Sequence, residues 1–194
     1  MQFRILAAGL LLCTAFVTPA RAAVAEDLSE ATRLHHAGQT AAALERVDRV
    51  LSTQPNDAQM RFLKSVILAD VGRSAEAQAI LQQLVQDYPE LPEPHNNLAA
   101  LHASAGDYGK SRAELEEAIR LNPSYGPAHE NLADVYALLA AQSYARALRL
   151  EPTSVSLPRK IALARQLTAL SSEPHPAAAT TPPPPARAGA PTKR

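Results

Sequence analysis

The chain has few of the residues that anchor a large core or carry thiol chemistry. Among its 194 residues there is no tryptophan, aromatic residues make up only 4%, and there is one cysteine. The remaining apolar content is mostly alanine and leucine, so an all-helical fold is expected. Basic and acidic side chains number 19 each, so the overall charge gives no reason to expect a nucleic acid or an anionic membrane as partner.

The first 22 residues have the pattern of a signal peptide. Arg4 gives a short positive start, and residues 5–17 form an apolar run too short to span a membrane. Small residues predict cleavage after Ala22 or nearby, so we expect an exported protein, in the bacterial periplasm. Lipoprotein processing is not favoured, because the large Leu12 precedes Cys13. Removal of this segment leaves a chain without thiols, whose stability must come from packing.

Glycine and proline recur with a fixed period. The turn glycines are Gly38, Gly72 and Gly106 and the closing prolines are Pro55, Pro89 and Pro123, so both series step by 34 residues. This spacing is typical of a helical solenoid, in which each helix hairpin buries its apolar face on the next. Three units follow, at residues 24–57, 58–91 and 92–125.

Each unit combines small and large residues on the inner face of its second helix. Small side chains at one repeat position let the two helices of a hairpin approach closely, and large ones fill the space further along. The small residues are Ala43, Ala77 and Ser111, followed by Val47, Leu81 and Leu115 and then by Val50, Leu84 and Ala118. The second unit has the most apolar first helix and is expected to form the centre of the core.

A fourth unit, residues 126–152, starts like the third but lacks its turn. Five residues that would include the turn glycine are missing, and no Gly, Pro, Asn or Asp lies between Asp134 and Leu150. We therefore predict one continuous helix over about residues 128–150, roughly 35 Å long. Its second half must pack on the helix after it or on another copy of the protein.

The C-terminal part is predicted to be a capping helix followed by a disordered tail. Over residues 157–170, an apolar stripe is formed by Leu157, Ile161, Ala164 and Leu167. Residues 171–194 are rich in proline and contain no large apolar residue, so they are expected to remain unfolded. This tail is either a solvated spacer or a ligand for an aromatic-lined groove.

The third unit, PEPHNNLAALHASAGDYGKSRAELEEAIRLNPSY, resembles the tetratricopeptide repeat (TPR). The matching positions are Leu98, Ala99, Gly106, Leu115, Ala118 and Pro123, with Ser111 where alanine is usual and His95 and His102 where aromatics are usual. The resemblance implies a right-handed solenoid over residues 23–170: three hairpins, a degenerate fourth repeat and a cap. It also implies a binding scaffold whose concave face is formed by the first helix of each unit.

The resemblance points to particular groove positions for a partner. They are Leu28, Thr32 and His35, then Phe62, Val66 and Ala69, then Asn96, Asn97 and Ala100, then Glu130, Asn131 and Asp134. Asn97 and Asn131 could bond the backbone of an extended peptide, or they could bond a neighbouring helix or water. The Lys, Asn and Arg set by which some relatives clamp a peptide's terminal carboxylate is absent.

Catalytic and metal-binding patterns are weak. His95 and His102 are seven residues apart on one helix and His129 could join them, but two of these positions are packing positions in the family. There is no glycine-rich phosphate loop, serine elbow or zinc-protease motif. We expect no cofactor and no enzymatic activity; a metal-dependent enzyme is a remote alternative.

The sequence therefore predicts a non-catalytic interaction scaffold or adaptor in the cell envelope. Its partner would be a protein or peptide, bound as an extended segment or a helix, and neither nucleic acid nor membrane insertion is expected after signal removal. An alternative is a structural module that self-associates through the long helix into a homo-oligomer. A third possibility is autoinhibition, in which Arg187, Lys193 and Arg194 of the tail reach the acidic end near Glu130 and Asp134.

Overall fold

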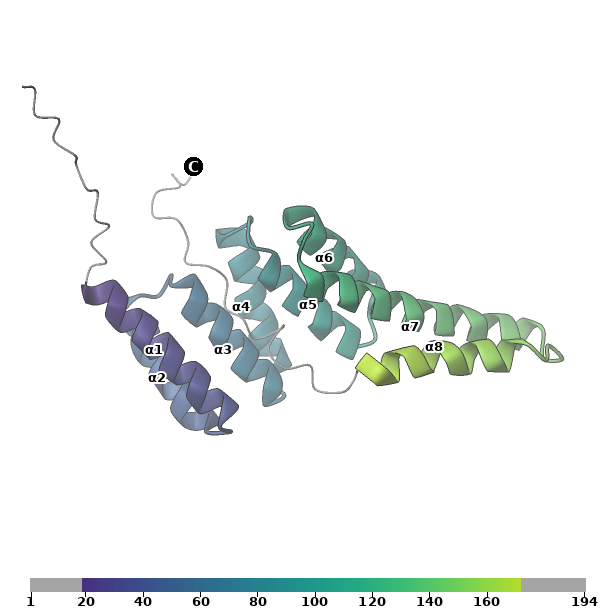
Figure 1. Ribbon diagram of the computed structural model, residues 1–194, viewed down its shortest axis with the longest axis horizontal. Helices are drawn as coiled ribbons and strands as arrows, with labels where there is room; N and C mark the ends of the chain where they lie inside the picture. Colours follow the sequence, from purple (N-terminus) through teal and green to yellow (C-terminus); the bar gives the residue numbers. More distant parts are fainter. Residues whose placement is uncertain (1–18, 172–194) are drawn as a thin grey trace, which may run out of the picture.

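The computed structural model describes residues 19–171, with side chains for residues 23–169. The predicted tail lies outside these residues, except for Ser171, which ends α8, and so does most of the predicted signal peptide. The described region is all-helical: α1 (Pro19–His36), α2 (Thr40–Thr53), α3 (Ala58–Asp70), α4 (Ser74–Asp87), α5 (Pro92–Ser104), α6 (Tyr108–Leu121), α7 (Gly126–Leu150) and α8 (Leu157–Ser171). α1 pairs with α2, α3 with α4 and α5 with α6, and Figure 1 shows these hairpins side by side, followed by the longer pair α7 and α8. The predicted solenoid is confirmed.

The turns within the three hairpins depend on glycine. Gly38, Gly72 and Gly106 have φ values of 73°, 78° and 79°, a left-handed conformation that is costly for residues with a Cβ. Asp107 then starts α6, since its side chain accepts a hydrogen bond from the Lys110 amide at 3.2 Å. The 34-residue glycine period of the sequence is therefore a period of obligatory turns.

The core runs along the stack as consecutive apolar clusters. The small residues predicted at the hairpin contacts, Ala43, Ala77 and Ser111, are fully buried, as are Val47, Leu84, Leu115 and Ala118. In the second unit, α3 is buried on most of its surface because α1, α4 and α5 all contact it. The predicted centre of the core is confirmed.

The fourth unit is one continuous helix, as predicted. α7 has 25 residues, and its second half packs on α8, which turns back along it (Figure 1). Among the described helices, α8 contacts only α7. No described helix combines the length and the apolar character needed to cross a membrane.

The predicted apolar stripe of α8 needs one correction. Leu157 and Ala164 are buried, but Leu167 is 60% exposed, and so is Leu163 at 54%. Because only α7 covers α8, a narrow face is buried, and half-buried Thr168 takes the inward position that Leu167 was predicted to occupy. Two leucines on α8 are thus left at the surface.

Candidate partner-binding groove

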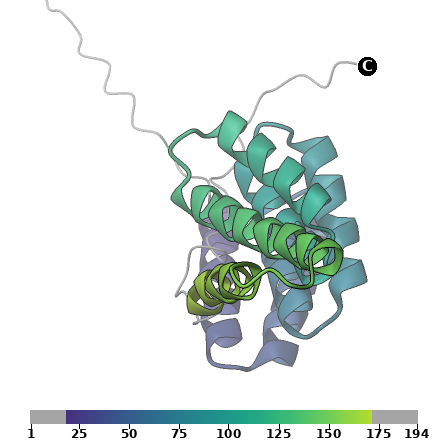
Figure 2. The ribbon, with the colours of Figure 1, turned by 90° about the vertical axis from the view of Figure 1, so that its right-hand side faces the viewer.

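The first helices of the units form the inner layer of a curved stack. α1 contacts α3, α3 contacts α5 and α5 contacts α7, whereas no two of the second helices α2, α4 and α6 contact each other. The stack is therefore tighter on the side of the first helices, which places them on the concave face. Figure 2, seen along the stack, shows α8 on the side of α7 away from α6.

A cavity of about 140 Å³ opens between α3 and α5 on this layer. Its lining consists of Ser65, Val66, Ala69 and Asp70 from α3, Leu81 from α4, and Asn97, Ala100 and Leu101 from α5. Four of these were predicted from repeat positions: Val66, Ala69, Asn97 and Ala100. The structure therefore brings the predicted residues of the second and third units together around one space.

The cavity has an apolar floor and a polar margin. Val66 and Leu81 are buried, whereas Ala100 and Asp70 are exposed. The hydroxyl of Ser65 donates to the Phe62 carbonyl of its own helix at 2.6 Å, so it is already satisfied. Apolar cavities of about 150 Å³ can hold a benzene molecule, so one ring-sized aliphatic side chain fits here.

His35 of α1 fixes the carboxylate at the cavity margin. Its Nε2 lies 2.8 Å from Asp70 Oδ2, which joins the first unit to the second. The predicted groove residue His35 therefore does not line the cavity, but it contacts Asp70, which does. This contact also leaves a carboxylate facing any segment that lies across α1 and α3.

A chain of three carboxamides joins α5 to α7. Asn131 Nδ2 donates to Asn96 Oδ1 at 2.8 Å, and Asn96 Nδ2 donates to Asn97 Oδ1 at 3.3 Å. Asn96 is 0% exposed, so these bonds satisfy groups that would otherwise be buried without partners. Of the two roles left open for Asn131, the bond to a neighbouring helix is present in the structure.

Two predicted groove residues lie inside the fold. Phe62 is 1% exposed and packs in the cluster of α3, α4 and α5, and Asn96 is equally inaccessible. Their repeat positions point toward the adjacent helices, so neither side chain can touch a partner in this conformation. They support the groove from beneath.

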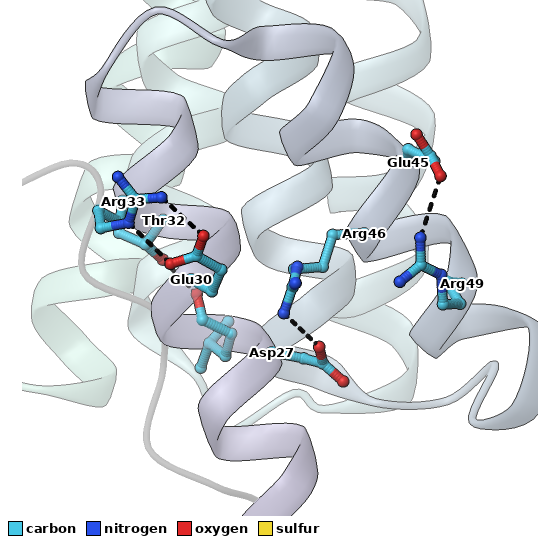
Figure 3. Close-up of polar contacts among 8 residues, drawn as sticks. Asp27, Glu30, Thr32, Arg33, Glu45, Arg46 and Arg49 are labelled. Atoms are coloured by element: carbon cyan, nitrogen blue, oxygen red, sulfur yellow. Dashed lines mark hydrogen bonds and ion pairs between the residues drawn. The ribbon is translucent and has the colours of Figure 1, made fainter.

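The remaining predicted positions lie at the two ends of the groove. In α1, Leu28 packs on the first core cluster and Thr32 Oγ1 donates to the Leu28 carbonyl at 2.8 Å. Figure 3 shows this region, where Arg46 of α2 also bonds Asp27 of α1 at 2.7 Å. In α7, exposed Glu130 and half-buried Asp134 form an acidic end that does not line the cavity.

Four lining residues, Ser65 among them, were not identified as groove positions from the sequence. Asp70 is the last residue of α3, Leu101 follows predicted Ala100, and Leu81 reaches the cavity from a second helix. Leu81 was predicted only as a packing residue inside its hairpin. Whether buried Leu81 borders a gap between α3 and α5 depends on how two hairpins dock, which the periodicity of one repeat does not encode.

The histidines that suggested a metal site make other contacts. His95 Nδ1 lies 2.6 Å from Glu114 Oε2, tying α5 to α6, and His129 Nε2 lies 3.0 Å from the Pro123 carbonyl. Over residues 23–169, no group of three or more His, Cys, Asp or Glu side chains could hold a metal ion. The packing interpretation of His95 is therefore the one the geometry supports.

Glu93 at the start of α5 and Tyr125 just before α7 have shifted pKa values, and neither residue lines the cavity. Burial raises the pKa of the Glu93 carboxyl above 4.5, and its Oε2 atom is buried without a hydrogen-bond partner among the described residues. Burial raises the pKa of Tyr125 to about 12, with the charge of Glu93 adding to the effect. Both groups therefore lie where the third unit meets the fourth, away from the cavity.

Comparison with known proteins agrees with this architecture. Two family models, each described as Tetratricopeptide repeat, match residues 34–104 and 92–125. No curated protein matches the sequence.

Three solved structures illustrate the similarity in fold. PilF of Pseudomonas aeruginosa is 18% identical, with a TM-score of 0.56 and coverage of 79% of this chain and 78% of that one. O-GlcNAc transferase of Thermobaculum terrenum is 23% identical (TM-score 0.57, 67% of this chain), and the Naa15/Naa10 complex bound to HypK-THB is 17% identical (TM-score 0.52, 75% of this chain). The match spans only 27% and 23% of the length of these last two chains. Residues 34–125 therefore match the tetratricopeptide repeat family, and the described fold is a TPR-type helical solenoid.

Proposed function

We propose that this protein is a non-catalytic interaction scaffold or adaptor of the cell envelope. Tetratricopeptide repeats generally mediate contacts between proteins, and stacked repeats offer extended concave surfaces for this purpose. The observation that carries the proposal is the cavity between α3 and α5, because it lies on the concave layer and combines an apolar floor with a carboxylate and a carboxamide at its margin.

The chemistry of the cavity defines what the partner must offer. One aliphatic side chain would enter the space above Val66 and Leu81, and a neighbouring donor would face Asp70. An extended segment presents side chains alternately, so it can place one in a pocket while its backbone meets a carboxamide such as Asn97. A partner helix that presents one apolar residue toward the groove is the other form that fits.

Export is supported by the signal-peptide pattern of the first 22 residues. α1 begins at Pro19, so cleavage after Ala22 would remove only its first turn. The test is to express the full chain in a bacterium, recover it from the periplasmic fraction and determine its N-terminal residue by mass spectrometry. Ala23 is the expected first residue, and an uncleaved chain in the cytoplasmic fraction would contradict export.

Binding in the groove is tested by filling the cavity. Ala69→Arg and Ala100→Arg each place a long charged side chain at the cavity, while Ala113→Arg makes the same change on the exposed outer face of α6. The two groove variants are expected to lose partners that the unaltered protein and Ala113→Arg both retain in quantitative pull-downs from an envelope fraction. Retention by all three variants would sink the groove proposal. Asn131→Ala is not used as a test, because it would remove the donor to the buried Asn96 Oδ1 and so disturb the fold.

Self-association is a second candidate, through α8 rather than through the long helix α7 as the sequence suggested, because α7 packs on α8. Leu163 and Leu167 are exposed four residues apart on α8, which among the described helices contacts α7 alone. A second copy that packs there would bury both leucines. Light scattering over a concentration series is the test: a dimer that Leu163→Glu plus Leu167→Glu abolishes would support this role, whereas a monomer at every concentration would dismiss it.

A further inference from the structure

We propose that the C-terminal segment of this same chain, residues 172–194, occupies the groove between α3 and α5 when no partner is bound. The inference rests on the proposed function, because it assigns an occupant to the same groove. An external partner would then bind in competition with the chain's own end.

The end of α8 places this segment at the groove. Lys160 Nζ of α8 lies 5.5 Å from the centre of the Tyr144 ring of α7. This contact shows which residues of the two antiparallel helices lie at the same level. Both helices rise about 1.5 Å per residue, so Ser171, eleven residues after Lys160, lies roughly level with the residue eleven before Tyr144. That level is next to Asp134, at the acidic end of the groove. Figure 1 shows α8 returning toward the repeat stack.

The segment is long enough to reach the cavity. The four consecutive prolines at 182–185 begin eleven residues after Ser171. An extended proline-rich chain advances about 3.1 Å per residue, so these prolines can reach about 34 Å from α8. Packed helices are about 8–10 Å apart, which puts the cavity between α3 and α5 about 15–25 Å from α7. The reach of the segment therefore exceeds the distance from α7 to the cavity.

The charges of the two parts are complementary. Residues 23–171 carry 14 basic and 18 acidic side chains, a net of −4. Residues 172–194 carry Arg187, Lys193 and Arg194 against Glu173, a net of +2. A basic segment is therefore attracted to a concave face that has Asp70 at the cavity and two acids on α7, and tethering keeps it within range of that attraction.

The proline run also matches the cavity in size and polarity. A proline ring is smaller than the benzene that a cavity of about 150 Å³ accommodates, and it has no polar atom to desolvate on its apolar floor. A run of prolines has backbone carbonyls but no backbone N–H, so its carbonyls can accept hydrogen bonds only from groups outside the run. The extended conformation is favoured before binding, so little entropy is lost.

Tethering makes even weak contacts sufficient. A segment joined by a short flexible linker has an effective concentration in the millimolar range, so an intrinsic Kd of about 1 mM fills the groove about half of the time. The apparent Kd of an external partner would then rise about twofold, since only the open fraction can bind it.

Photo-crosslinking in the purified full chain tests the proposal. A photo-reactive amino acid replaces exposed Ala100 at the cavity, and Ala113 on the outer face of α6 is the matched control site. Trypsin cuts after Arg165 and Arg187, so the expected adduct joins the α5 peptide to peptide 166–187 within one molecule. The control site should give none. In the variant with Arg187→Glu, Lys193→Glu and Arg194→Glu, trypsin releases the segment as peptide 166–194, and the yield of its adduct should be severalfold lower.

Each result has one meaning for the proposal. Absence of peptide 166–187 from the Ala100 adducts, or equal yield from Ala113, would overturn it. Crosslinked dimers would overturn it too, because the segment would then come from a second copy. If the adduct fails while the arginine variants at Ala69 and Ala100 still lose external partners, the groove binds partners and only the self-binding is wrong. If the adduct forms while those variants keep their partners, the groove belongs to the tail and the proposed function fails.

Discussion

Replacing Ala118 with leucine is the sharpest test of the packing between the third and fourth units. Ala118 on α6, Ala99 on α5 and Ala128 on α7 are each 0% exposed and belong to one cluster. Three alanines at one junction let three helices approach closely, and no space is left for the three carbons that leucine adds. Overpacking of this kind costs about 1–3 kcal/mol of the free energy of unfolding.

The assay is thermal unfolding followed by circular dichroism. For a chain of this size each kcal/mol lowers Tm by about 2–4 °C, so a loss of about 2–12 °C is expected for Ala118→Leu. Ala113→Leu adds the same atoms to an exposed site of the same helix and should change stability by less than about 0.5 kcal/mol. Equal Tm values for the two variants would refute the close approach of α5, α6 and α7.

Three further predictions concern charge, coupling and backbone. Glu93→Gln should raise Tm at pH 7 and leave it unchanged near pH 4, and an equal gain in Tm at both pH values would contradict this. The reason is that burial raises the folded-state pKa of the Glu93 carboxyl above 4.5, so ionisation of this carboxyl destabilises the fold as pH rises through that pKa. A double-mutant cycle of His95→Ala and Glu114→Ala should give a coupling energy of about 1 kcal/mol, and additive effects would rule out the contact. Gly72→Ala should cost about 1–2 kcal/mol in chemical denaturation because φ is +78°, whereas Gly126→Ala, at a helix start without positive φ, should cost nothing; equal losses would refute the turn argument.

The sequence predicts most of this fold because a solenoid is built from contacts between near neighbours. The period marked by Gly38, Gly72 and Gly106 sets the register of all three hairpins, so burial of Ser111 and Leu115 follows from a single repeat. Even the missing fourth turn could be read from composition, since nothing in the second half of α7 stops a helix.

The groove could be predicted only in part. The repeat positions include Val66 and Asn97, which line one cavity, and also Phe62, which the docking of α3 against α4 and α5 buries. Whether a first-helix residue faces the groove or a neighbouring helix depends on how adjacent hairpins are rotated relative to each other, which one repeat does not encode. The exposure of Leu167 has a similar origin, because it depends on α8 packing against one described helix rather than two.

The central claim is that partners bind across the cavity between α3 and α5. The most direct measurement is photo-crosslinking in living cells from Ala100 at the cavity, with Ala113 on the outer face as the comparison. The account predicts adducts with a second protein from Ala100 and none from Ala113. Adducts with a second protein from Ala113 alone, or in equal yield from both sites, would contradict it.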